Sequence, residues 1–415
     1  MTTLTIYVIV SVIMTHTKEQ GIITSSLDTD MYKLTMGQAV LGRYKDVNVG
    51  YGFINRGKTE FPDNFDKDLQ KQLELISKVK LKDHERKFLA EGCNDVFKND
   101  YLDWFSQYQF NPDEVFITRQ DAGLDITVEG PWSRTIYWEV PLMAIISETF
   151  FEKTGQTPNP KWIEKTQEKG KELQLAGAKF VDMGTRRRFS YFVQDKAVEA
   201  LKKSAGSSLL GTSNLHFAQK HKLTPVGTMA HEWIMAHSAM FGFPRANETA
   251  IQAWLEEYQG KLAVALTDTF TTDIFLRDFG RDMAQKFVGL RQDSGNPKEI
   301  ADKFINFYKS HGIDPMTKKA LFSDSLNVEK VLDILKHCEG KINSVFGIGT
   351  NFTNDVGVKP LNMVIKLMYL QSLQDKYKIN TCKFSDDPGK TSGATDAVQR
   401  AQVELGLNRD LSVAA

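Results

Sequence analysis

The stretch KFVDMGTRRRFSYFVQDKAVEAL, residues 179–201, shows the pattern that decides the fold: a short apolar run, a polar loop, then a helical pattern. The same order recurs along the second half of the chain. The polar loops are DMGTRRR (182–188), GTSN (211–214), GTMAHEW (227–233), RQDSG (291–295), FSDS (322–325) and FGIGTN (346–351). Repeated strand, loop and helix units bring their loops to the same end of parallel strands, so we expect one site built there.

The apolar runs predict seven strands, at residues 179–181, 208–210, 224–227, 262–266, 287–290, 320–322 and 342–346. The third is the least secure because Pro225 has no N–H to donate to a neighbouring strand. We therefore predict an α/β fold, an irregular TIM-like parallel α/β barrel that follows an α+β N-terminal domain.

The first half of the chain is mixed in pattern. We expect a helix at 28–44, an amphipathic helical stretch around 65–105 and strands at 115–117 and 135–140. The predicted domains are an α+β domain at 21–175, a catalytic barrel at 176–368 and a C-terminal segment at 369–415 that returns to the first domain. Within the barrel, Pro297 after Asn296 and Ser325 before LNVEKVLDIL mark helix starts.

Residues 1–20 form an N-terminal extension with an apolar run at 4–14. This run is too short to span a bilayer and has no Lys or Arg before it, unlike a signal peptide. Two interpretations stand: a disordered or packed arm, or residues upstream of a true start at Met14.

Composition narrows the function classes. The chain has 415 residues with 52 Lys and Arg against 52 Asp and Glu, so it lacks the basic field of a nucleic-acid-binding protein. We expect a small-molecule partner, and neither nucleic acid nor membrane. Its three cysteines, Cys93, Cys338 and Cys382, have no paired spacing, which favours a reducing, cytoplasmic compartment.

Cations and carboxylates occur in separate loops that the barrel would bring together. Arg186 and Arg291 carry guanidinium forks that suit phosphate or carboxylate, while Asp268, Asp293 and Asp324 suit Mg²⁺ or sugar hydroxyls. A magnesium-bound phosphorylated sugar satisfies both sets. For a single arginine, a solvated surface charge is the alternative.

The loop from Gly347 to Asn351 follows a predicted strand. Glycine lets the backbone approach an anion, so its amides can hold a phosphate. A tight turn at the end of a barrel strand explains the same glycines.

His231 is predicted to begin a helix, where the dipole disfavours imidazolium and keeps a lone pair available, so that the imidazole can act as a nucleophile, a base or a ligand. A capping or packing histidine is the alternative. His237, farther along the same helix, is interpreted as structural. No His or Cys cluster has structural-zinc spacing, so we do not expect zinc.

The chain resembles the nicotinate phosphoribosyltransferase family. The match runs from TDMYKLTMGQA (29–39) through DMGTRRRFS, GTSN, GTMAHEW, RQDSGNP, FSDS and FGIGTN to PGKTSG (388–393). The resemblance implies a type II phosphoribosyltransferase architecture. It also implies transfer of phosphoribosyl from 5-phosphoribosyl 1-pyrophosphate to nicotinate, which gives nicotinate mononucleotide and pyrophosphate for NAD salvage.

The resemblance also implies that ATP transiently phosphorylates His231 and that Mg²⁺ is required. Asp268 and Asp293 become candidates for the sugar, the cationic transition state and the metal, and Arg186 and Arg291 for the anionic substrates. The predicted phosphate site comprises Ser323, Asp324, Gly347, Gly349 and Thr350.

Three further residues concern the pyridine. Ser213 stands where nicotinamide-using relatives carry aspartate, and its hydroxyl can donate to the nicotinate carboxylate. Capping of the following helix is the alternative for Ser213. Tyr32 resembles a tyrosine that stacks on the ring from a neighbouring subunit, which implies a homodimer; a core tyrosine is the alternative. Opposite it this chain has Met183 where we expect phenylalanine, and a thioether can also pack on a ring.

Other functions stay open at this point. Within the fold, the substrate is alternatively nicotinamide or quinolinate, although quinolinate has a second carboxylate that requires more cations. From another class, the chain is alternatively a barrel that binds a nucleotide without turning it over.

Overall fold

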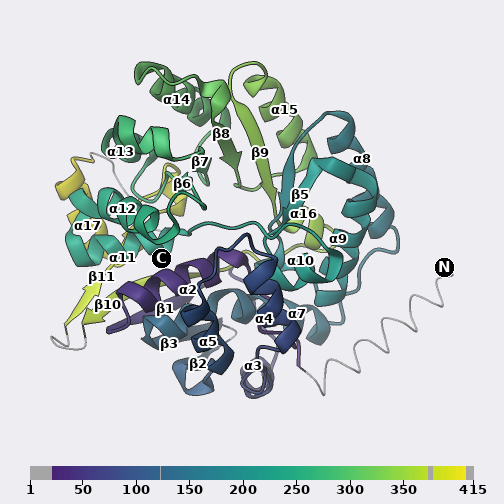
Figure 1. Ribbon diagram of the computed structural model, residues 1–415. Coiled ribbons are helices and arrows are strands. Elements are labelled where there is room, and N and C mark those ends of the chain that lie inside the picture. Colours follow the sequence, from purple (N-terminus) through teal and green to yellow (C-terminus); the bar gives the residue numbers. More distant parts are fainter. Residues whose placement is uncertain (1–20, 122, 373–376, 408–415) are drawn as a thin grey trace.

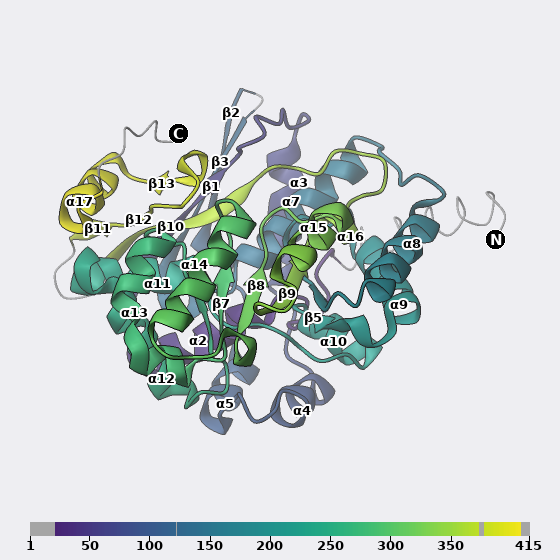
Figure 2. The same ribbon diagram turned by 90° about the horizontal axis from the view of Figure 1, so that it is seen from above.

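The computed structural model describes residues 21–121, 123–372 and 377–407 (Figure 1). The interpretations of residues 1–20 therefore lie outside the described residues. The fold has two main sheets, one antiparallel and one parallel, with helices around them. Figure 2 shows the parallel strands β7, β8 and β9 with α14 and α15 on their outer side.

The antiparallel sheet has five strands in the order β11-β10-β1-β3-β2. Their bounds are β1 Val47–Ile54, β2 Val115–Gln120, β3 Gly123–Pro131, β10 Val364–Ser372 and β11 Lys378–Asn380. The strands β10 and β11 follow the parallel sheet in the chain, yet β10 pairs with β1 along its whole length. This pairing carries the chain from the barrel back to the N-terminal sheet.

The helices that precede the parallel sheet are α2 Met31–Arg43, α3 Phe65–Ile76, α4 Asp83–Glu91, α5 Asn99–Gln107, α6 Trp132–Thr135, α7 Glu139–Lys153 and α8 Trp162–Leu175. The predicted helix at 28–44 corresponds to α2. The helical stretch around 65–105 is divided among α3, α4 and α5. Short 3-10 turns lie at Pro112–Glu114, Thr185–Arg187, Gly206–Ser208, Phe243–Arg245, Pro315–Thr317 and Pro388–Lys390.

The parallel sheet has six strands in the order β5-β4-β9-β8-β7-β6. They are β4 Phe180–Asp182, β5 Leu209–Thr212, β6 Val264–Leu266, β7 Gly289–Gln292, β8 Lys319–Phe322 and β9 Asn343–Ile348. The helices that follow are α9 Tyr191–Ala205, α10 Leu215–His221, α11 His231–Phe241, α12 Ala246–Tyr258, α13 Thr272–Lys286, α14 Pro297–Ser310, α15 Val328–Cys338 and α16 Thr350–Thr353. The predicted α/β fold, an irregular parallel barrel with a separate N-terminal domain, is confirmed.

The last described elements are β12 Cys382–Lys383, β13 Ser392–Gly393 and α17 Thr395–Leu405. The strands β12 and β13 form a small antiparallel pair. No helix among the described residues is both long and apolar enough to cross a membrane.

One predicted barrel strand is wrong. Residues 224–227 are not a strand, and only an isolated bridge joins Thr212 to Pro225. Pro225 cannot donate to a ladder, and the sheet order does not join β5 to β6. The barrel is therefore irregular at the place where the proline lies.

Two local predictions are also wrong. Residues 135–140 belong to α6, a turn and the start of α7 rather than to a strand. The aromatic and β-branched residues there have strand propensity, but the run is buried and tertiary packing overrides propensity. Ser325 is not a helix cap, because α15 begins after Asn327, whose side chain accepts from Lys330 N–H.

Two helix starts are confirmed. Pro297 occupies the first position of α14, and the Asn296 side chain caps it by accepting from Lys298 N–H. His231 is the first residue of α11. The position of His231 is therefore fixed by the segment that leads into α11.

Candidate active site

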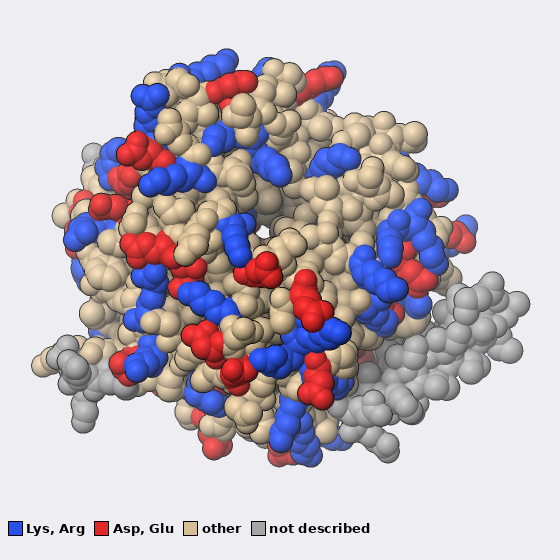
Figure 3. Space-filling model, viewed as in Figure 1, with Lys and Arg blue, Asp and Glu red and all other residues tan. Residues whose placement is uncertain are grey.

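The predicted site residues lie at one end of the parallel sheet. Met183 and Arg186 follow β4, Ser213 follows β5, Asp268 follows β6, Asp293 follows β7 and Ser323 follows β8. The carboxyl ends of parallel strands form a shared edge, which explains why loops far apart in sequence meet. Figure 3 shows that the face of Figure 1 is hollowed near its centre, with acidic and basic side chains interspersed around the hollow.

His231 is buried and has a polar group at each ring nitrogen. Its Nδ1 lies 3.0 Å from Thr269 Oγ1, and its Nε2 lies 3.1 Å from Asp293 Oδ2 and 3.0 Å from Lys383 Nζ. Burial, together with the positive charge of Lys383, lowers the pKa of His231 to about 4. The imidazole is therefore neutral at physiological pH.

Asp268 and Asp293 flank this histidine. Asp268 Oδ2 accepts from Lys383 Nζ at 2.9 Å and from Ser294 Oγ at 2.6 Å. Burial alone would raise the pKa of Asp268, but Lys383 and His231 outweigh it and hold the pKa below its usual value. For Asp293, the close contact with His231 and the charge of Arg291 outweigh burial in the same way and lower its pKa well below the usual value.

The carboxylates bear on the expected metal. Among the described residues, no group of three or more His, Cys, Asp or Glu side chains is placed to hold an ion. Mg²⁺, however, is often bound by one or two carboxylates plus substrate phosphates. Asp268 Oδ1 is buried without a hydrogen-bond partner, so this donor set fits that mode of binding.

The predicted pyridine-site residues line one pocket of about 380 Å³. Its lining includes Tyr32, Met183, Arg186, Ser213 and Arg291. These side chains come from α2 and from the ends of different barrel strands, so the fold brings together all five residues that the sequence singled out for substrate binding.

Hydrogen bonds within the pocket differ from what the sequence suggested for Ser213. Its hydroxyl donates to Asp30 Oδ1 at 2.8 Å, a contact across 183 positions of sequence. Burial raises the pKa of Asp30 despite the charge of Arg186. The Ser213 hydroxyl proton is therefore already used in the hydrogen bond to Asp30, and the Ser213 oxygen lies beside a buried carboxyl group.

Tyr32 and Arg186 share a carboxylate at the other side of the pocket. Tyr32 donates to Glu139 Oε2 at 3.3 Å, and Arg186 Nη1 lies 3.3 Å from Glu139 Oε1. Arg186 is held in place by this pair while the rest of its guanidinium fork can meet an anion.

Met183 packs against the glycine loop after β9. A Cβ added to Gly347 would lie 2.4 Å from Met183 Sδ, so a larger residue there would require the thioether to move. A Cβ added to Gly349 would lie 3.2 Å from the backbone oxygen of Met183.

The predicted phosphate residues lie at the ends of the neighbouring strands β8 and β9, and Ser323 has the most contacts among them. Its hydroxyl donates to Asp293 Oδ1 at 2.7 Å and accepts from Arg291 Nε at 3.1 Å. Asp324 pairs with Lys390 Nζ at 2.5 Å, which brings the C-terminal segment to the loop. Gly347 is the next-to-last residue of β9, Gly349 follows the strand, and Thr350 begins the short α16.

Comparison with known proteins agrees with this geometry. The model of the nicotinate phosphoribosyltransferase (NAPRTase) family matches residues 178–408, and the model of its N-terminal domain matches residues 27–147. The chain belongs to the nicotinate phosphoribosyltransferase family.

Members of this family match nearly the whole chain. A nicotinate phosphoribosyltransferase of Desulforapulum autotrophicum is 44% identical over 90% of this chain and 96% of its own length. That of Chromohalobacter salexigens is 42% identical over 93% and 99%. The crystal structure of nicotinate phosphoribosyltransferase from Porphyromonas gingivalis superposes with a TM-score of 0.91, at 38% identity, over 93% of this chain and all of that one.

This nicotinate phosphoribosyltransferase family member contains functional candidates that the sequence did not single out. Lys383 contacts both His231 and Asp268, and Glu139 joins Tyr32 to Arg186. Burial and the charge of Lys383 lower the pKa of Lys366 to about 7. The only signal for Lys383 was the expected return of the C-terminal segment 369–415, whereas Lys366 lies just before that segment, in the range predicted as barrel. A lone lysine has no sequence pattern that marks it as part of a site.

The structure also separates the three consecutive arginines. Arg186 lines the pocket, whereas Arg188 is fully buried and makes a bidentate pair with Asp28, at 2.8 and 2.9 Å. Arg188 therefore stabilises the fold of this family member and does not face the pocket.

Proposed function

We propose that this chain transfers the phosphoribosyl group of 5-phosphoribosyl 1-pyrophosphate to nicotinate, in the salvage of pyridine for NAD. The proposal is supported mainly by one observation: a pocket lined by Arg186 and Arg291 lies at the same end of the sheet as a buried, neutral His231. His231 is flanked by the carboxylates of Asp268 and Asp293. Family membership supports the same reaction.

In the proposed transfer, the pyridine nitrogen attacks C1 of the ribose with its own lone pair, so no base is needed. The C1–O bond to pyrophosphate breaks, and pyrophosphate leaves with the bonding electrons. Asp268 and Asp293 stay ionised because their pKa values are lowered, so their negative charge can stabilise the oxocarbenium-like sugar. Mg²⁺, held by these two carboxylates, would neutralise charge on the departing pyrophosphate.

We also propose that ATP phosphorylates His231. His231 Nε2 faces both Lys383 Nζ, which can only donate, and Asp293 Oδ2. We propose that the reacting tautomer is the one in which Lys383 donates to Nε2 and the proton is on Nδ1, where Thr269 Oγ1 accepts it; in this tautomer Asp293 accepts no hydrogen bond from the imidazole. Nε2 then attacks the γ-phosphorus, an N–P bond forms, and ADP leaves as the P–O bond breaks. The lowered pKa of His231 supports this step because it keeps the nucleophile unprotonated.

Assembly as a homodimer is a proposal that rests on the resemblance alone. Tyr32 lines the pocket beside Arg186 of the same chain. Light scattering on the purified chain measures the mass directly. A cytoplasmic location is proposed from the free, buried state of Cys93, Cys338 and Cys382.

The test measures pyrophosphate release from 5-phosphoribosyl 1-pyrophosphate and Mg²⁺ with nicotinate, nicotinamide or quinolinate, each with and without ATP. We expect release with nicotinate that ATP increases. Release with nicotinamide or quinolinate in its place would reassign the substrate. The absence of release with all three would leave a binding role.

A further inference from the structure

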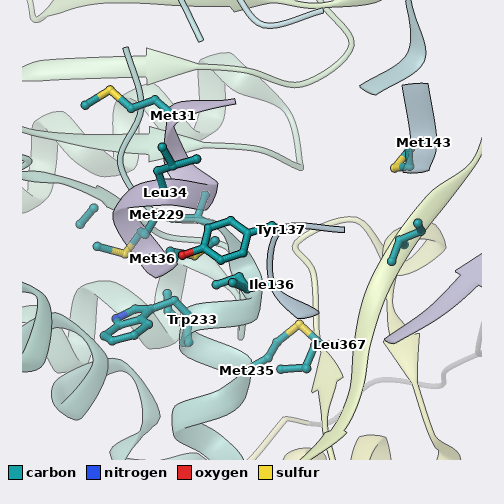
Figure 4. Close-up of a cluster of buried hydrophobic side chains, with 14 of the residues drawn as sticks. Met31, Leu34, Met36, Ile136, Tyr137, Met143, Met229, Trp233, Met235 and Leu367 are labelled. Atoms are coloured by element: carbon teal, nitrogen blue, oxygen red, sulfur yellow. The ribbon is translucent and has the colours of Figure 1, made fainter. Parts of the chain in front are cut away.

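The helix α2 connects the pyridine pocket to the segment that presents His231. Asp30 precedes its first residue, and Tyr32 lies in its first turn; both line the pocket. The remainder of the helix runs along the residues that lead into α11. Figure 4 shows Met31, Leu34 and Met36 of α2 in the same buried cluster as Met229 and Trp233.

Close contacts fix this segment to α2. A Cβ added to Gly227 would lie 2.8 Å from both Met31 Cβ and Tyr32 N, so the backbones approach as closely as glycine permits. Thr35 Oγ1 donates to Thr228 O at 2.7 Å. Residues 227–230 are therefore held against α2, and a displacement of α2 would move them with it. His231 comes three residues after Thr228.

Lys33 is the charged contact between the two elements. It is completely buried on α2, and its Nζ pairs with Glu139 Oε2 at 2.6 Å and also with Glu232. Burying an ammonium and two carboxylates costs free energy unless each is paired, so removing any one of the three would leave an unpaired buried charge and destabilise the fold.

The two carboxylates have different second partners. Glu139 contacts Tyr32 and Arg186 in the pyridine pocket. Glu232 follows His231 directly in α11 and accepts from Tyr51 Oη at 3.2 Å. A continuous path of charge pairs thus runs from Arg186 through Glu139 and Lys33 to the residue beside His231.

We propose that Lys33 is a positioning residue that links occupancy of the pyridine pocket to the placement of His231, through Glu139 and Glu232. A ligand carboxylate that binds the free part of the Arg186 guanidinium shares its positive charge with Glu139 and so weakens the Arg186–Glu139 pair. The ion pair between Glu139 and Lys33 then strengthens, and the ion pair between Lys33 and Glu232 weakens in return. The first turn of α11, and with it His231, responds to the ligand.

This inference rests on the proposed function, because it takes nicotinate as the ligand that approaches Arg186. It makes no catalytic claim for Lys33, which lies behind the pocket and does not reach the reacting atoms. Its effect is on the environment of His231, which can be observed without turnover.

The experiment follows the imidazole signals of His231 by NMR on full-length protein labelled with ¹⁵N in its eight histidines. His231→Asn assigns the signal. Nicotinate is added to the wild type, to Lys33→Met and to Glu232→Gln, and its binding is measured in parallel by calorimetry. Glu232→Gln keeps the side-chain shape, so it remains informative where Lys33→Met fails to fold.

Glu114→Gln is the matched control. Glu114 is a buried glutamate that pairs with Arg134 at 2.8 Å and accepts from an indole, Trp138 Nε1, at 2.8 Å. Glu232 likewise has a cation partner and an indole, Trp132. The control removes the same kind of buried charge outside the path from Arg186 to His231.

We expect nicotinate to shift the His231 signals in the wild type and in Glu114→Gln, and this shift to be lost in Glu232→Gln although nicotinate still binds. The inference is overturned if nicotinate binds to the wild type without shifting the His231 signals. It is also overturned if Lys33→Met and Glu232→Gln both keep the full shift, because the ligand would then act on His231 directly through its electric field. Failure of nicotinate to bind the wild type would instead reject the proposed function, and the inference with it.

Discussion

Lys383 Nζ lies 3.0 Å from His231 Nε2 and 2.9 Å from Asp268 Oδ2. An ammonium at this position stabilises the Asp268 carboxylate and destabilises an imidazolium at His231. One side chain from the C-terminal segment therefore adds to the effect of burial in keeping His231 neutral, and it helps to keep Asp268 ionised. It joins a segment remote in sequence to the centre of the proposed chemistry.

The pH dependence of His231 phosphorylation follows from this contact. The pKa of His231 is lowered from 6.5 to about 4, so the imidazole is neutral above about pH 4. We expect ATP-dependent phosphorylation to persist as the pH falls from 7 to about 5, where an ordinary histidine would be mostly protonated. Rapid-quench labelling with γ-labelled ATP measures the rate. In Lys383→Met, whose His231 lacks the opposing charge, the loss should begin at higher pH; identical profiles in the two proteins would contradict this account.

His231→Asn should abolish stimulation by ATP and leave some ATP-independent transfer, because the carboxylates and the pyridine pocket stay in place. The measurement is pyrophosphate release with and without ATP. His237→Asn is the control: His237 is buried on the same helix, but it contacts Tyr44 and Trp233 O and should keep the stimulation. Full stimulation in His231→Asn would remove the phosphohistidine from the mechanism.

Ser213→Asp should weaken the use of nicotinate. Ser213 Oγ donates to Asp30, so the substitution places a second carboxyl beside a buried one and opposes the carboxylate of the substrate. We expect KM for nicotinate to rise by at least about tenfold, which corresponds to about 1.4 kcal/mol. Ser213→Ala removes the hydroxyl without adding charge and separates the two effects. Unchanged selectivity between nicotinate and nicotinamide in Ser213→Asp would reject a role in specificity.

The sequence predicted the parallel barrel because each strand, loop and helix unit is local. Pro297 and His231 begin helices where expected, since caps and first-turn residues act within a few positions. Residues 135–140 were mispredicted because burial against other elements decides their conformation. The local sequence pattern does not reveal which residues elsewhere in the chain bury this run.

The same distinction applies to the site. Arg186, Ser213 and Arg291 could be expected to meet because they lie at the ends of barrel strands, whereas Tyr32 lies in α2 and was expected at the site only from the family resemblance. Arg188, two positions after Arg186, could not be distinguished from it in the sequence, since buried partners remote in the chain, above all Asp28 and also Glu148, fix its direction. Lys33, Glu139 and Lys383 are single charges with partners far away in the sequence: Lys33 pairs with Glu232 across 199 positions and Lys383 with Asp268 across 115. Even Glu139 and Arg186 are 47 positions apart, and no local spacing predicts such pairs.

Lys366 on β10 should make substrate binding depend on pH near neutrality. Its pKa is lowered to about 7 by burial and by the charge of Lys383, so the side chain is charged below about pH 7 and neutral above it. Glu139 and Arg186 are among the groups that influence it, which places this charge near the pyridine pocket. Anionic substrates should therefore bind less tightly as the pH rises from 6 to 8.

We expect KM for nicotinate or for 5-phosphoribosyl 1-pyrophosphate to rise over this range by roughly threefold to tenfold, the effect of losing one nearby charge. Lys366→Met should start with the higher KM and show a flat profile. Lys378→Met removes a half-exposed lysine from the neighbouring strand β11 and should keep the wild-type profile. A profile in Lys366→Met as steep as that of the wild type would show that another group titrates, and it would exclude Lys366 as the source of the pH dependence.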